Sequence, residues 1–155
     1  MASEILKFSF ISAIILTALL CGASLDQSIK QLPARHIIGA RAFSEFQIAA
    51  DLKNGVPLYA FLGIGAALTA ILTAIFALLN LDKEVYKLPL LIGGILAVCH
   101  SICTAMAAPT NFSQKGIQDE EKLRRIHNKF ERIQTIRSAF IVLNFACYIW
   151  VLLSL

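Results

Sequence analysis

Four stretches of the chain contain no Asp, Glu, Lys or Arg and are rich in large apolar residues: 8–25, 54–81, 88–114 and 138–155. A helix of about 20 apolar residues is long enough to cross the hydrocarbon core of a bilayer. Inside lipid every backbone N–H and C=O must pair within its own segment, which favours helices. The pattern therefore predicts four membrane-spanning helices in one all-α domain over 1–155, at about 5–25, 57–80, 88–108 and 133–154.

Small and large side chains fall on opposite faces of the third span when successive residues are about 100° apart. The large ones are Leu91, Ile95, Val98 and Ile102, and the small ones are Gly93, Ala97, Ser101 and Thr104, with His100 beside them. Small residues also share a face in the first span (Ser9, Ala13, Thr17 and Cys21) and in the second (Gly65, Thr69 and Thr73). The fourth span instead aligns larger polar residues on one face: Gln134, Arg137, Asn144 and Tyr148. Large apolar side chains suit lipid, whereas small ones let helix backbones approach. The faces predict an integral membrane four-helix bundle with a small, mildly polar interior.

The loops between the spans also carry helical patterns. Apolar residues recur among charged ones over 34–53, which predicts an amphipathic cytosolic helix in the first loop, on the membrane face or extending the second span. A turn is expected at Asn54-Gly55. Pro57 and Pro89 are expected in the first turns of their helices, and Pro109 just past the end of the third. The charged run 119–132 predicts a cytosolic extension of the fourth helix.

The distribution of charge predicts which ends of the four helices face the cytoplasm. Only 15% of the residues are charged and 57% are hydrophobic, which excludes a soluble globule and a disordered chain. Of the 14 Lys and Arg residues, all but Lys7, Lys83 and Lys87 lie in the first and third loops or at the start of the fourth helix. Because positive loops stay in the cytoplasm, both termini are expected outside or in a lumen. The net charge of +4 comes from this bias, so it does not indicate binding to nucleic acid, and the expected partner is the lipid bilayer. Whether the chain forms a homo-oligomer stays open.

A cleaved signal peptide is the alternative interpretation of the first span, since Lys7 precedes an apolar run that ends at Cys21-Gly22-Ala23. Glu4 does not fit the positively charged beginning of a signal peptide, and the apolar run is long. We therefore expect the first span to be retained as a membrane helix.

Two ionisable residues stand out inside the predicted spans, where burying a charge is costly and points to function. His100 lies in the middle of the third span, where it is either a neutral histidine hydrogen-bonded to a neighbouring helix or a group that transfers protons near neutral pH. Arg137 lies in the first turns of the fourth span, where it either reaches the interface or faces inward with Asn144 and Tyr148 to hold an anionic oxygen. Cys99, His100 and Cys103 make an incomplete metal site on one helix, so no metal is expected. Phosphate-binding and nucleophile-elbow motifs are absent from the sequence.

The order of several short segments resembles the anthrone oxygenase-like family of small four-span membrane proteins. The segments are Gln31-Leu32-Pro33-Ala34-Arg35, Asn54-Gly55-Val56-Pro57, Ala108-Pro109-Thr110-Asn111 and Ile133-Gln134-Thr135-Ile136-Arg137-Ser138. Pro109, Asn111 and Arg137 carry most of the resemblance, which spans nearly the whole chain. Family members often have a tryptophan about four residues before this arginine, where the present chain has Ile133.

The resemblance implies a membrane bundle that oxygenates an apolar aromatic or lipid-like substrate without metal, flavin or other cofactor. An anthrone forms an electron-rich enolate that reacts directly with oxygen, so the protein need only bind it, take a proton and stabilise an oxyanion. On this interpretation His100 is the base. The partners of the oxyanion are Arg137, Asn111 and Asn144, and Tyr59 and Tyr148 line the substrate cavity.

Two other functions remain open at this point. A glutathione-dependent membrane enzyme of the eicosanoid type also has four spans, but its motif of Arg, Asn, Glu and Pro is matched here only by Arg41, Glu45 and Pro57, at the wrong spacing. A non-enzymatic scaffold or small transporter would fit the bland interior of the bundle, although transporters more often show broken spans or paired internal charges.

Overall fold

The structure, a computed structural model, describes residues 2–81 and 84–154. Throughout that part the regular elements are helical, and four long helices dominate: α1 (Ala2–Leu25), α4 (Val56–Asn80), α5 (Glu84–Phe112) and α6 (Glu120–Ser154). Each belongs to a helical stretch that is long and apolar enough to cross a membrane. The prediction of an all-α chain with four candidate spans is confirmed.

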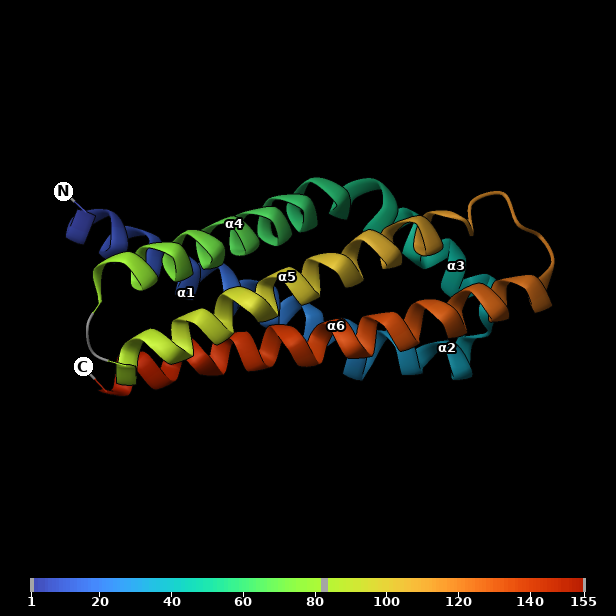
Figure 1. Cartoon of the computed structure of the whole chain (residues 1–155). Helices are drawn as coiled ribbons and strands as arrows, with labels where there is room; N and C mark the ends of the chain where they lie inside the picture. Colours follow the sequence, from blue (N-terminus) through green and yellow to red (C-terminus); the bar gives the residue numbers. More distant parts are fainter. Residues whose placement is uncertain (1, 82–83, 155) are drawn as a thin grey trace.

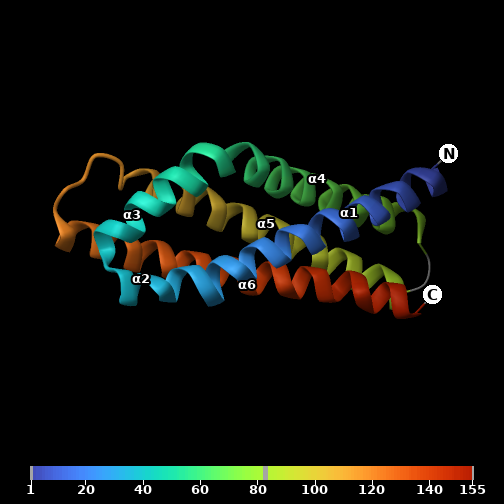
Figure 2. The same cartoon turned by 180° about the vertical axis from the view of Figure 1, so that it is seen from behind.

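The four long helices run side by side as an elongated bundle (Figure 1). Helix α1 packs against α4 and α6, α4 packs against α5, and α5 packs against α6. Both termini, the end of α4 and the beginning of α5 lie at one end of the bundle, and the short helices and the α5–α6 connection lie at the other (Figures 1 and 2). We call these the terminal end and the loop end.

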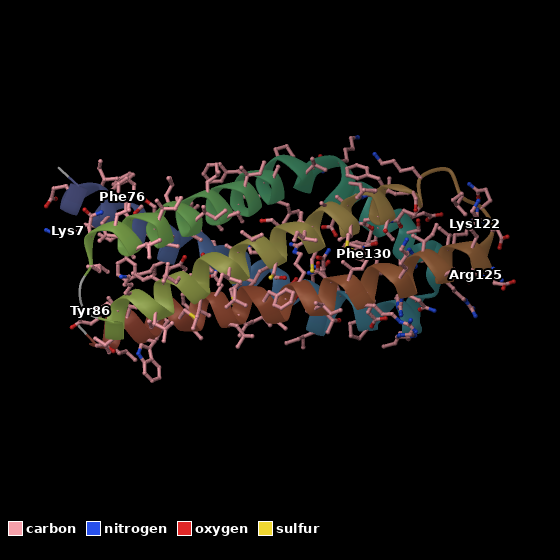
Figure 3. All side chains as sticks on the ribbon, in the orientation of Figure 1. Lys7, Phe76, Tyr86, Lys122, Arg125 and Phe130 are labelled. Atoms are coloured by element: carbon pink, nitrogen blue, oxygen red, sulfur yellow. The ribbon has the colours of Figure 1, made fainter. Side chains whose placement is uncertain are left out.

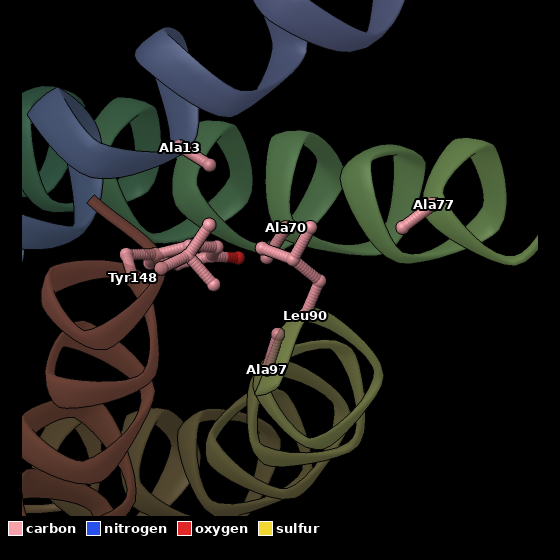
Figure 4. Packing of buried hydrophobic residues seen from close by; sticks show 7 residues of the cluster. Ala13, Ala70, Ala77, Leu90, Ala97 and Tyr148 are labelled. Carbon is pink, nitrogen blue, oxygen red and sulfur yellow. The ribbon is translucent and has the colours of Figure 1, made fainter. Parts of the chain in front are cut away.

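Small side chains hold the helices together, as their spacing predicts. The predicted inner face of α1 is buried at all four positions, Ser9, Ala13, Thr17 and Cys21. Ala13, Ala70, Ala77, Leu90 and Ala97 form one apolar cluster with Tyr148 (Figure 4). On the opposite side of α5, Ile95, Val98 and Ile102 are exposed. Small residues inside and large apolar residues outside are typical of helices that pack in lipid.

The first loop differs from the single helix predicted over 34–53. It contains two short helices, α2 (Leu32–Ile38) and α3 (Ala40–Ala49), separated at Gly39. The φ angle of Gly39 is 88°, a conformation that side chains with a Cβ rarely adopt. The chain can therefore change direction there and still keep helical hydrogen bonds on both sides, from Gly39 N to Arg35 O (3.0 Å) and from Phe43 N to Gly39 O (3.1 Å).

The turn predicted at Asn54-Gly55 is wrong, because the backbone stays helical there. Two π-helical segments, η1 (Asp26–Gln31) and η2 (Ala50–Gly55), connect the short helices to α1 and α4. Gly55 has right-handed helical angles, with φ −79° and ψ −23°. A π-helix pairs each N–H with the carbonyl five residues earlier, and six residues are too few for its side-chain period to be told from that of an α-helix.

The third long helix extends beyond both predicted ends. Helix α5 begins at Glu84 and ends at Phe112, so Pro89 and Pro109 both lie inside it. A proline removes one backbone donor but keeps its carbonyl, and Ser113 N donates to Pro109 O at 3.0 Å. By contrast, the predicted extension of α6 through the charged run is confirmed: Asp119 Oδ1 accepts hydrogen bonds from Glu121 N and Lys122 N at its start.

Candidate functional site

A cavity of about 620 Å³ lies between α4 and α5 in the half of the bundle nearer the loop end, and it reaches α1, α6, η1 and η2. Its walls are mostly apolar. The polar or ionisable residues that line it are Gln27, Asp51, Tyr59, His100, Ser101, Thr104, Asn111 and Arg137. Several lining residues are also exposed on the outer surface of the bundle, namely Ala60, Ile64 and Leu68 of α4 and Ala105 and Phe112 of α5. The cavity therefore opens to the outside between these two helices.

His100 lies deep in this cavity, on the inner face of α5. Its side chain is only 2% exposed, and its Nε2 atom has no hydrogen-bond partner within the described chain. A buried imidazole nitrogen without a partner retains its full capacity to accept or donate one hydrogen bond. His100 therefore places an unpaired imidazole nitrogen beside the cavity.

Arg137 reaches the same cavity from α6. Its Nε atom is buried without a partner, and the described residues provide no ion pair for its guanidinium. It lines the cavity together with His100 of α5 and Tyr59 of α4, so three helices contribute to one site. A cation in such surroundings favours an anionic oxygen as its ligand.

Asp51 and Gln27 complete the site, and sequence reasoning missed both. The Asp51 side chain is 8% exposed, and its Oδ2 accepts a hydrogen bond from Gln27 Nε2 at 3.1 Å. Burial raises the pKa of the Asp51 carboxyl above its ordinary value. Asp51 precedes Tyr59 by eight residues, and both line the cavity. A spacing of about two helical turns places two residues on one face of a helix, so this spacing could have indicated that Asp51 belongs to the site.

Asn111 lies at the loop end of the cavity, within a network of side chains. Gln114 Nε2 donates to Asn111 Oδ1 at 2.5 Å and to Gln47 Oε1 at 3.2 Å, and His127 Nε2 lies 3.1 Å from Gln114 Oε1. Burial, and to a lesser extent the charge of Arg35, lowers the pKa of His127 to about 4. His127 is therefore a neutral structural histidine near pH 7, in contact with the ring of Phe43.

The six predicted site residues divide into two groups. Tyr59, His100, Asn111 and Arg137 share the cavity, but the structure does not place Asn144 and Tyr148 there. Those two lie on the same face of α6 as Arg137 but two or three turns closer to the terminal end, where the helices close around them. The Tyr148 hydroxyl and both polar atoms of the Asn144 side chain are buried without partners, and a Cβ added to Gly93 would lie 3.0 Å from Asn144 Oδ1.

The positions of His100 and Asn111 along α5 restrict which part of a bound molecule each residue can contact. Asn111 follows His100 by eleven positions in α5, which corresponds to about 16 Å along a helix. Asn111 is therefore too far along α5 from His100 for both to contact the same oxygen of a ligand. His100 and Arg137 together could take a proton from an apolar molecule and stabilise the oxyanion left behind, an effect that low polarity strengthens.

The cysteines and the acidic residues offer no metal centre in the described ranges. Within 2–81 and 84–154, no three His, Cys, Asp or Glu side chains come close enough together to hold a metal ion. All four cysteines are free, and Cys99 and Cys103 lie partly buried on α5.

Comparisons with protein-family models, with curated proteins and with solved structures found no match to this chain.

Proposed function

We propose that the protein is an integral membrane oxygenase that acts, without a cofactor, on an apolar aromatic substrate of the anthrone type. One observation carries the proposal: His100 and Arg137, from different helices, line one largely apolar cavity instead of facing outward. A largely apolar cavity with a few convergent polar groups is typical of small-molecule sites. The resemblance of the short sequence motifs to the anthrone oxygenase-like family supports the same chemistry.

The proposed reaction begins when neutral His100 takes a proton from the CH2 group of the substrate. Arg137 stabilises the enolate oxygen that forms, because a cation in an apolar site favours developing negative charge. The enolate carbon gives one electron to O2, and the two radicals join through a new C–O bond to give a peroxide anion. Protonated His100 returns its proton to the outer peroxide oxygen, which gives a hydroperoxide. His100, neutral again, then takes the second hydrogen from the carbon as a proton while the O–O bond breaks, which leaves the new carbonyl and a hydroxide. The hydroxide accepts that proton and departs as water.

The outer opening between α4 and α5 suggests how an apolar substrate reaches this site. The lining residues exposed at the opening are apolar, and in a bilayer these helix faces would contact lipid. An apolar aromatic molecule dissolves in the bilayer, so on this proposal it enters sideways without crossing water. The large apolar side chains on the outside of the bundle support membrane insertion.

Oxygen uptake with a hydroxylated anthrone tests the proposal. The wild-type protein in lipid nanodiscs should consume oxygen well above the spontaneous oxidation measured with empty nanodiscs. His100→Gln should lower the protein-dependent rate roughly 10²–10⁴-fold, the usual contribution of general base catalysis. His36→Gln, at an exposed histidine of α2, is the matched control and should retain the wild-type rate. Equal rates for all three proteins would exclude His100 as the base, and no uptake above empty nanodiscs would exclude the oxygenase itself.

For the topology, we propose that the loop end faces the cytosol and that both termini face outside or a lumen. The termini share one end of the bundle (Figure 1), and most Lys and Arg residues belong to the segments at the other end. Positive loops are retained in the cytoplasm. A glycosylation tag added after Leu155 should be modified in intact microsomes, whereas the same tag inserted between Lys115 and Gly116 should not; the reverse pattern would overturn the orientation.

The glutathione-dependent alternative finds no corresponding feature in this site. It requires Arg41 to face a ligand between subunits. Arg41 lies exposed on α3, pairs with Glu45 over 3.6 Å and does not line the cavity. A non-enzymatic scaffold would not need a cavity of this size.

A further inference from the structure

A second hollow, of about 400 Å³, lies on the outer surface of the loop end, between the end of α5 and the beginning of α6. Its lining residues are Pro109, Thr110, Ser113, Lys122, Arg125, Ile126 and Lys129. None of them lines the cavity of the proposed oxygenase. Figure 3 shows Lys122 and Arg125 at this end, next to the connection between the two helices.

Three cations converge on this hollow, and only one of them is neutralised by the described part of the chain. Lys122, Arg125 and Lys129 recur at intervals of three and four positions, so they share a face of α6. Arg125 pairs with Glu121, while Lys122 and Lys129 have no ion-pair partner among the described residues. The hydroxyls of Thr110 and Ser113 donate to backbone carbonyls of α5. The free donors are thus cationic, and the hollow carries net positive charge.

The hollow continues into apolar helix faces on its membrane side. One to two turns before Pro109 and Thr110, the same face of α5 exposes Ile102 and Met106. Beyond Lys129, the same face of α6 exposes Ile136. Cations at the boundary of the predicted spans match the anionic headgroup of a phospholipid, and the apolar side chains within the spans match its acyl chains.

We propose that this hollow binds the phosphate of an anionic phospholipid headgroup, with the acyl chains along the exposed faces of α5 and α6. Lys122 and Lys129 hold the phosphate oxygens, and Arg125 adds a third donor. The site is independent of the oxygenase cavity, so either proposal can fail while the other stands.

Native mass spectrometry or microscale thermophoresis of the detergent-solubilised protein tests this site with phosphatidylglycerol and with phosphatidylcholine as probes. The wild type should prefer phosphatidylglycerol. The double variant Lys122→Gln/Lys129→Gln should lose this preference by roughly 30-fold, from the usual contribution of two lysines near anionic lipid. The control Arg41→Gln/Arg124→Gln removes the same charge from exposed pairs at the same end of the bundle and should retain it. An equal loss in both double variants, or no preference in the wild type, would overturn the proposal.

A further arm distinguishes the lipid headgroup from free phosphate, which shares its chemistry. Inorganic phosphate at millimolar concentration should compete poorly with phosphatidylglycerol, because it gains nothing from the apolar faces beside Ile102 and Ile136. Replacement of Met106 by Gln should weaken phosphatidylglycerol binding and leave phosphate binding unchanged. Efficient competition by phosphate together with no effect of Met106→Gln would overturn the lipid assignment.

Discussion

Arg137→Gln is expected to lower protein-dependent oxygen uptake with an anthrone by roughly 10²–10³-fold, the cost of losing one main donor to an oxyanion. Arg137 lines the cavity and has no ion pair within the described chain, so nothing nearby replaces its charge. Arg137→Lys should recover part of the rate, because an ammonium restores the charge but not the planar donor geometry.

The same substitution should leave the stability of the protein unchanged or raise it. A half-buried guanidinium without a partner is costly inside a bundle, and a neutral side chain removes that cost. Loss of activity with unchanged or higher thermal stability separates a residue that acts on substrate from one that holds the fold. Stability can be followed by circular dichroism of the protein in detergent.

Arg132→Gln is the control for this experiment. Arg132 lies exposed on the same helix and does not line the cavity, so it removes the same charge without touching the site. It should leave oxygen uptake at the wild-type rate. If Arg137→Gln kept full activity, or if both variants lost activity to the same degree, Arg137 could not be the group that stabilises the enolate.

His100 and Arg137 could be selected as candidate site residues from the sequence because the signal depends only on the residues next to them in the chain. An ionisable residue in a long apolar run is visible without knowing the fold, and small residues at helical spacing showed which face of α5 would be buried. The structure agrees: Gly93, Ala97 and His100 are all buried. The bundle followed from the same patterns, since lipid allows few alternatives to a helix for an apolar segment.

Asp51 and Asn144 show where this reasoning fails. Asp51 belongs to a charged segment whose pattern resembles a solvated surface, and only the packing of η2 against the bundle buries it beside Gln27. Asn144 shares a face with Arg137, but position on a face does not reveal where along the bundle a cavity ends. Both outcomes depend on how far neighbouring helices approach, which a single sequence does not encode locally.

A large effect on stability is expected from Gly94→Leu, which should lower the free energy of unfolding by about 3 kcal/mol, the upper range for overfilling a packed interior. A Cβ added to Gly94 would lie 2.6 Å from the Cβ of Ala74 and 3.9 Å from the backbone oxygen of Ala70. Because the near atom is itself a Cβ fixed to the backbone of α4, α4 and α5 would have to separate to admit any side chain.

Gly22→Leu is the matched control, since a Cβ added to Gly22 meets no atom within 4 Å. It should unfold at the wild-type temperature in detergent, whereas Gly94→Leu should unfold at a clearly lower one; equal midpoints would show that α4 and α5 are not held by this contact. The contact lies on the terminal side of His100, where the helices close and the cavity ends. If the helices separate there, the spacing between the cavity walls changes as well, so Gly94→Leu should also weaken substrate binding even though Gly94 does not line the cavity.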